Sequence, residues 1–267
     1  MRRNGPLALI FHTIFVIVMV APILVVCLVA FTPEGFLSLP TNGFSPRWFR
    51  TIASYPELVH AFWVSLGLGM VSSVAPLFAV PAALAIARYR FRGRHALAAL
   101  FLSPPMIPHV VLGIAFLRFF TLMGVGGTFL ALLIAHVVVV FPFALRLALA
   151  AATGMDRSIE MAAISLGADG FTLFRRVILP AILPGIVSGW ALAFIQSFDD
   201  LTMTVFLATP GTETLPVRMF LYIQDNIDPL VTSVSASVIA ITMTVLVLLD
   251  RFYGLDRVLA GKGDTGR

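Results

Sequence analysis

Charged residues are scarce in this chain of 267 residues, and cysteine occurs only once. Only 12% of the residues are Asp, Glu, Lys or Arg, whereas 59% are hydrophobic. A water-soluble domain has roughly 25% charged residues, so the composition excludes an ordinary soluble fold and indicates a polytopic membrane protein. The single cysteine, Cys27, excludes an internal disulfide framework.

Several chemical motifs are also missing. The sequence has no G-x-x-x-x-G-K-[ST], because its only lysine is Lys262, so it lacks the P-loop that would hold ATP phosphates. One cysteine and five scattered histidines give none of the usual metal-ligand spacings, and no motif pairs a nucleophile with a base. The sequence therefore predicts no enzyme, no metal and no cofactor in this chain. The formal charge of +5 fits Lys and Arg in cytoplasmic loops and does not predict nucleic acid as a partner.

Long apolar runs are what the sequence has in place of charge. A membrane-spanning helix needs roughly 17–25 mostly apolar residues. Six runs qualify, separated by polar or Gly/Pro-rich connections: 8–31, 60–87, 96–121, 127–150, 185–208 and 230–250. The predicted fold class is therefore all-α, a multi-pass protein with six transmembrane helices in a lipid bilayer. The count falls to five if one proline-containing run is re-entrant.

The cationic residues predict the orientation of these spans. With the N-terminus in the cytoplasm, Arg2, Arg3 and the basic run 88–95 (RYRFRGRH) fall on the cytoplasmic side, as do most of the eighteen Lys and Arg residues. The positive-inside rule therefore places both termini in the cytoplasm, together with the segment 160–185.

That segment, EMAAISLGADGFTLFRRVILPAILPG, is poorly suited to crossing a bilayer, and its beginning predicts a helix. Asp156 or Ser158 can cap the helix, because a short polar side chain can accept a hydrogen bond from a free backbone N–H. Glu160 suits the positive end of the helix dipole. The sequence therefore predicts a short helix that lies outside the bilayer.

The rest of the segment predicts a turn and a second helix. Gly167 and Gly170 indicate a break, and 171–178 is typical of a short amphipathic helix. Pro180 and Pro184 are expected to end that helix and redirect the chain into the fifth span. The simplest alternative is an amphipathic loop that only rests on the lipid headgroups.

The spacing A162-A163-x3-G167-x9-V177-x-L179-P180 resembles the EAA motif, E-A-A-x3-G-x9-I-x-L-P, of permease subunits of bacterial binding-protein-dependent ABC importers of type I. Met161 stands at the Glu position, with Glu160 one residue earlier, and Val177 replaces Ile. The resemblance implies that the cytoplasmic loop, about 151–184, is a coupling helix that docks on a dimer of a separate ABC ATPase, which binds the ATP. The residues so implied are Glu160, Met161, Ala162, Ala163, Gly167, Ala168, Phe171, Arg175, Leu179 and Pro180.

Three further stretches, FSPRWFRTI, LIAHVVVVFPFALR and SFDDLTMTVFLATPGTETLPV, resemble the spermidine/putrescine permease group, and its second subunit in particular. The resemblance implies a location in the bacterial inner membrane, a similar but distinct partner permease and a periplasmic solute-binding protein. It also implies three parts: an N-terminal helix with a periplasmic linker (1–59), the transmembrane type-1 domain (60–250) and a cytoplasmic tail (251–267).

Two adjacent acids, Asp199 and Asp200, fall inside the predicted span 185–208. A carboxylate deep in a span costs roughly 2.5–3.5 kcal/mol, so it usually faces a cavity or a partner. The pair could line a path for a cationic solute, or it could bond to neighbouring helices or to Arg118. Weaker candidates for the path or a gate are His109, His136, Gln196 and Ser197. The glycines at 185 and 189 have the spacing that lets helices approach closely.

Three functions remain open from the sequence. The first is an ABC importer permease for a polyamine. The second has the same fold and another solute, such as ferric ion, molybdate, thiosulfate or an opine. The third is an ATPase-independent secondary transporter that uses the two acids, although the inverted repeats common in such folds are not evident.

Overall fold

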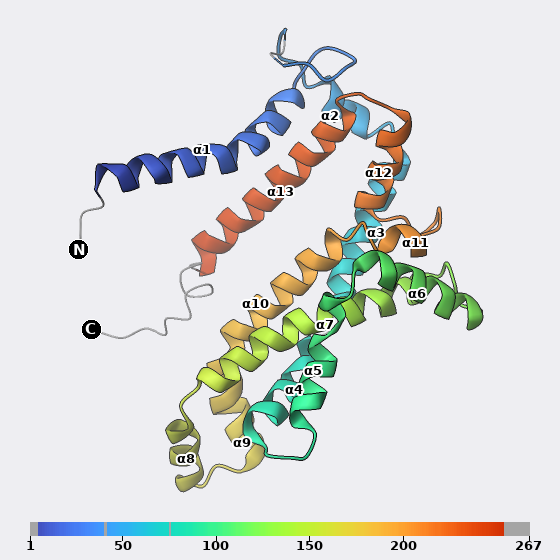
Figure 1. The fold of residues 1–267 in the computed structure, drawn as a ribbon. Helices are drawn as coiled ribbons and strands as arrows, with labels where there is room; N and C mark the ends of the chain where they lie inside the picture. The colour runs from blue at the N-terminus through green and yellow to red at the C-terminus, as the bar shows by residue number, and fades with distance from the viewer. Residues whose placement is uncertain (1–4, 40–41, 75, 254–267) are drawn as a thin grey trace. The chain divides into compact units, whose positions relative to one another are not determined.

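The computed structural model describes residues 5–39, 42–74 and 76–253. Within these ranges the chain is almost entirely helical and contains no β-strand, which confirms the all-α prediction (Figure 1). Arg2 and Arg3 lie outside the described residues, as does the predicted tail from residue 254 onward. The described residues divide into two compact units, one within 5–60 and 219–248 and the other within 61–218 and 249–253.

The first unit contains α1 (Pro6–Val29), α2 (Arg47–Ile52) and most of α13 (Leu230–Tyr253). Ser233 Oγ of α13 donates a hydrogen bond to the Ala30 carbonyl at 3.0 Å, which joins α13 to the end of α1. The connection after α1 is held by Trp48, whose Nε1 donates to the Glu34 carbonyl at 3.1 Å. These contacts tie α13 to the end of α1 and Trp48 of α2 to the segment just after α1.

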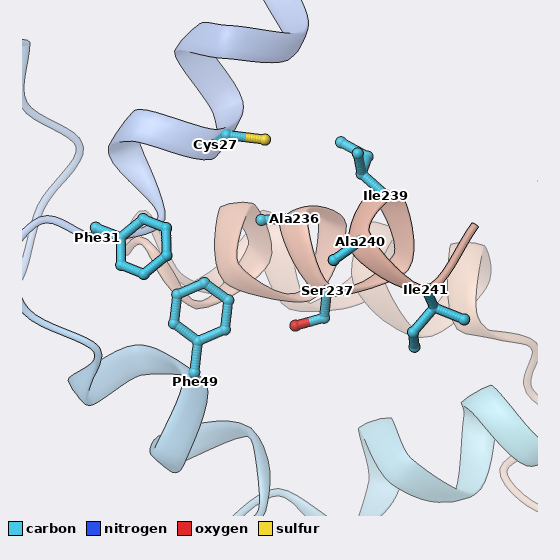
Figure 2. Close-up of a pocket in the computed structure, with 8 residues that line it drawn as sticks. All are labelled: Cys27, Phe31, Phe49, Ala236, Ser237, Ile239, Ala240 and Ile241. Carbon is cyan, nitrogen blue, oxygen red and sulfur yellow. The ribbon is translucent and has the colours of Figure 1, made fainter. Parts of the chain in front are cut away.

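An open apolar groove of about 520 Å³ lies between α1 and α13. Figure 2 shows its lining, in which Phe31 and Phe49 face the small side chains of α13 near Cys27. The one hydroxyl in the lining, that of Ser237, donates to the Ser233 carbonyl of its own helix at 2.8 Å. No charged side chain lines the groove, so it presents only apolar surface.

The core of the second unit is formed by α4 (Pro76–Arg88), α7 (Phe129–Gly154) and α10 (Leu179–Phe198), with α7 and α10 side by side (Figure 1). Small side chains fill these contacts. The buried cluster consists of Ala79, Val80, Ala83, Ala144, Leu145, Ala148, Ala152 and Ile182. A Cβ at Gly185 would lie 2.5 Å from Ala151 Cβ, so the glycine spacing brings α10 against α7 within this chain.

Most of the predicted spans correspond to helices. In the part of the chain that the structure describes, four helical segments are long and apolar enough to cross a membrane: Leu7–Val29, Pro56–Arg88, Phe129–Gly154 and Gly170–Phe198. The second contains α3 (Pro56–Ser72) and α4. Two shorter apolar helical stretches, His109–Leu122 and Leu230–Val245, fall in the third and sixth predicted spans.

The prediction of one helix over 96–121 is wrong. This run forms α5 (Arg94–Leu102), a 3₁₀ turn (Pro104–Met106) and α6 (His109–Leu122). Ile107 is extended, with φ −89° and ψ 131°, because the residue before a proline is disfavoured in the helical region. The prolines therefore divide the apolar run into two short helices.

The expected bounds of the fifth span are also wrong at both ends. The helix ends at Phe198 rather than at residue 208, and a short helix, α11 (Thr204–Leu207), follows. At the other end, Pro180 does not break the chain, since α9 (Gly170–Leu173) continues through a π-helical turn (Phe174–Ile178) into α10. Ile178 keeps right-handed helical angles, φ −69° and ψ −53°, and Pro180 falls in the first turn of α10, where proline is tolerated.

Candidate functional site

The predicted cytoplasmic loop begins with a capped helix, α8 (Arg157–Ser165). Asp156 is the cap and accepts a hydrogen bond from Ser158 N–H at 2.9 Å, which holds the pKa of its carboxyl below its usual value. The helix ends in a turn at Gly167, whose φ of +87° lies in the left-handed region that favours glycine. Asp169 is the N-cap residue of α9, and a hydrogen bond from the Thr172 hydroxyl lowers the pKa of its carboxyl.

This loop has an exposed apolar surface. Met161 is 62% exposed and Leu166 is 90% exposed. Of the residues implied by the EAA resemblance, Met161, Ala162, Gly167, Phe171, Arg175 and Pro180 are exposed, and Glu160, Ala163, Ala168 and Leu179 are half-buried. Exposed apolar side chains beside small residues form the kind of surface that binds another protein.

Glu160 points toward the transmembrane core and not into solvent. Its Oε1 lies 2.5 Å from Nη2 of Arg88, the last residue of α4. Arg157 Nη2 donates to the Ala87 carbonyl at 3.4 Å. No local pattern in the sequence pairs Arg88 with α8, because the two belong to helices far apart in the chain.

A second cluster lies where α10 ends. Asp200 is 7% exposed. Its Oδ2 accepts hydrogen bonds from Thr204 N–H at 3.0 Å and Thr204 Oγ1 at 2.7 Å, and its Oδ1 lies 3.1 Å from His109 Nδ1. The Asp200 carboxylate accepts a hydrogen bond from the backbone of Thr204, a local bond that competes with continuation of α10, and α10 ends at Phe198. Asp200 therefore lies just after the end of α10 and not within a helix, and its partner is His109 rather than Arg118.

His136 of α7 extends this cluster into the core. Its Nε2 lies 2.9 Å from Thr204 Oγ1, and its Nδ1 lies 2.8 Å from Ser197 Oγ. Ser72 Oγ donates in turn to Ser197 Oγ at 2.8 Å. His136, a candidate for the path or a gate, is 1% exposed and contacts two side-chain hydroxyls.

The polar network (Ser72, His109, His136, Ser197, Asp200 and Thr204) joins α3, α6, α7 and α10 to the segment around α11. Ser72 and Thr204 were not predicted as site residues. The position of Thr204 four residues after an acid was a weak signal, whereas nothing in the sequence indicates Ser72. Asp199 is exposed and Gln196 is half-buried, and neither side chain hydrogen-bonds to another described residue. Of the two adjacent acids, Asp199 is therefore the exposed one.

Removing the bridging hydroxyl tests the network. Thr204→Val keeps the side-chain shape but removes one hydrogen bond from the Asp200 carboxylate and one from His136, while His109 and Ser197 stay in place as their other partners. We expect the free energy of unfolding to fall by about 1–3 kcal/mol, the cost of an unsatisfied buried polar group. Thermal unfolding of the detergent-solubilised protein measures this. Thr153→Val is the control, since the Thr153 hydroxyl bonds only to carbonyls of its own helix, and an equal loss in both variants would contradict the account.

Comparisons with known proteins agree on one class. A family model described as "Binding-protein-dependent transport system inner membrane component" matches residues 77–256. Over 265 residues the chain is 29% identical to the spermidine/putrescine transport system permease protein PotC of Escherichia coli (strain K12), covering 99% of this chain and 97% of that protein. It is also 29% identical over 227 residues to the putrescine transport system permease protein PotI of the same strain, covering 82% and 80%.

Among solved structures, the fold resembles that in the crystal structure of a bacterial ABC transporter involved in the import of the acidic polysaccharide alginate. The TM-score is 0.70, over 95% of this chain and 100% of that one, at 14% sequence identity. At this identity the likeness shows the fold alone.

Proposed function

Because the chain belongs to the family of binding-protein-dependent transport system inner membrane components, we propose that it forms half of the translocation pathway of an ABC importer for spermidine, putrescine or a similar polyamine. A member of this family is a transport component and not an enzyme. It works with a binding protein that delivers the solute and with a separate ATPase that supplies the energy.

The observation that carries the choice of solute is the identity to PotC along nearly the whole chain, 99% of it, rather than over one motif. The structure adds a chemical reason. Asp199 is exposed at the end of α10 and does not hydrogen-bond to another described residue. In this proposal the exposed carboxylate lies beside the solute path, where it would favour a cation over an anion because opposite charges attract.

The exposed apolar surface of α8 supports docking of the ATPase on the cytoplasmic loop. This assignment places the C-terminal end of α7 and both chain termini on the cytoplasmic side of the inner membrane. The other half of the pathway is a second, homologous permease in a heterodimer, and the solute-binding protein approaches from the periplasm.

Uptake of radiolabelled spermidine tests this function. Cells that lack their own polyamine importers would express the chain with its partner permease, ATPase and binding protein. We expect ATP-dependent spermidine uptake that unlabelled putrescine competes for and that ferric ion, molybdate, thiosulfate and opines do not. Competition by one of those solutes alone would contradict the polyamine assignment, and uptake that persists without the ATPase would contradict the importer assignment.

A further inference from the structure

Helix α8 turns one narrow face toward the rest of its unit. Of its nine residues only Glu160 and Ala163 are half-buried, and the other seven are exposed. Arg157 and Glu160 are three residues apart and therefore lie on neighbouring positions of one helix face. Both contact the C-terminal end of α4, Glu160 through Arg88 and Arg157 through the Ala87 carbonyl.

The charges of the Arg88–Glu160 pair suit the helix ends where they lie. Arg88 is in the last turn of α4, where the helix dipole favours a cation, and Glu160 is in the first turn of α8, where it favours an anion. The side chains are only 12% and 15% exposed, so water screens the pair weakly. Removing one partner would leave the other partly buried and unpaired, which is unfavourable.

The pair also accounts for the position of the acid, which stands at 160, one residue before the EAA-motif Glu position that Met161 occupies. Consecutive residues of an α-helix are turned by about 100° around the axis, so an acid one position earlier points in a different direction. Met161 is 62% exposed, on the surface that we propose docks the ATPase. Glu160 is turned away from that surface and toward α4.

Arg88 is a suitable anchor because α4 is packed firmly. Ala79 and Ala83 of α4 belong to the buried cluster with α7 and with Ile182 of α10. By contrast, α8 has no buried residue. A displacement of α8 that reaches α4 is therefore passed to α7 and α10 through close-packed side chains, which transmit strain.

We propose that Glu160 and Arg88 are positioning residues that join α8 to the end of α4, so that α8 moves together with the α4, α7 and α10 core during transport. The proposal rests on the proposed function, in which α8 is the helix that docks the ATPase. The acid at 160 thus acts within this chain, and the contact to the ATPase at the neighbouring position is apolar.

Charge reversal in the complete importer tests the pair. We compare Glu160→Arg, Arg88→Glu and the double variant that exchanges the charges, all in proteoliposomes with the partner permease, ATPase and binding protein. Each single variant is expected to lower spermidine uptake per ATP hydrolysed by at least about fivefold, the lower end of typical coupling between sites. The amount of ATPase that co-purifies is expected to stay the same, and the exchanged pair is expected to recover part of the uptake. Arg90→Glu is the matched control, since Arg90 lies two residues away and is exposed.

Cross-linking tests whether α8 and α4 move together. Arg88→Cys and Glu160→Cys, in a Cys27→Ser background, are joined by a short reversible bis-methanethiosulfonate, and uptake is compared before and after cross-linking because this variant lacks the charge pair. Uptake that the cross-link maintains or raises supports a single moving body. Uptake that is lost on cross-linking and restored by a reductant would show that α8 swings away from α4, and would overturn the proposal.

Single charge reversals that leave spermidine uptake per ATP hydrolysed unchanged would also overturn the proposal. A loss of co-purifying ATPase in the single variants would equally contradict a positioning role, because it would place Glu160 or Arg88 in the docking contact itself. If no ATPase co-purifies with the wild-type chain, the proposed function itself is contradicted. If the ATPase co-purifies with the wild-type chain and Glu160→Arg leaves uptake unchanged, only the positioning role is contradicted.

Discussion

Gly167→Val is expected to weaken docking of the ATPase and to reduce ATP-driven uptake. The backbone at Gly167 has φ +87°, a region that a β-branched residue adopts only with strain of about 1–3 kcal/mol. No atom lies within 4 Å of the position where its Cβ would be, so the effect comes from the backbone and not from a clash. Relief of the strain requires the turn after α8 to change, which moves Leu166 and Phe171 relative to α8.

Each 1.4 kcal/mol changes a binding constant tenfold, so the ATPase should bind roughly 5-fold to 150-fold more weakly. Co-purification of the ATPase with the tagged chain, followed by titration, measures the change. Gly170→Ala is the matched control, because Gly170 is also in open space and does not have a positive φ. Wild-type docking by the Gly167→Val protein would mean that this turn has no part in binding the ATPase.

Gly185→Val is expected to destabilise the folded chain itself. A Cβ at this position would lie 2.5 Å from Ala151 Cβ and 3.1 Å from the Leu147 carbonyl oxygen. The carbonyl is backbone in the middle of α7 and cannot rotate away, so the two helices would have to separate. Overpacking typically costs 1–3 kcal/mol, and we expect about 3 kcal/mol here.

Such a loss lowers the midpoint of thermal unfolding by roughly 6–12 °C for a chain of this size. Size-exclusion chromatography of heated detergent extracts gives the midpoint. Gly67→Val controls for the helix propensity of valine, since Gly67 is also helical and no atom lies within 4 Å of its Cβ position. A midpoint that falls equally in the two variants would exclude the close contact of α7 and α10 as the cause.

Local signals in the sequence predicted the helix α8 and the turn that follows it. Asp156 and Gly167 define the start and end of α8 through a side-chain cap and a positive φ, and both depend on only a few neighbouring residues. The apolar runs predicted most helices for a similar reason, because hydropathy is summed along the chain. The prolines after residue 103 indicate a break in the helix, but a hydropathy averaged over 96–121 does not detect it, because the whole run is apolar.

Contacts between distant residues could not be predicted in this way. The bond between Ser72 and Ser197 joins positions 125 residues apart, and that between Arg157 and Ala87 joins positions 70 apart. Serine and arginine occur at many positions, so their types alone do not indicate which pairs meet. For the same reason the sequence predicts one environment for Asp199 and Asp200, although only Asp200 is buried in the polar network.

The central claim is that this chain transports only when a separate ATPase drives it through the loop at 151–184. The most direct measurement is spermidine uptake into proteoliposomes that contain the complete importer, with ATP supplied on the side of that loop. We predict uptake with the active ATPase and none when the lysine of the ATPase P-loop is replaced. Equal uptake with the inactive ATPase would contradict the account.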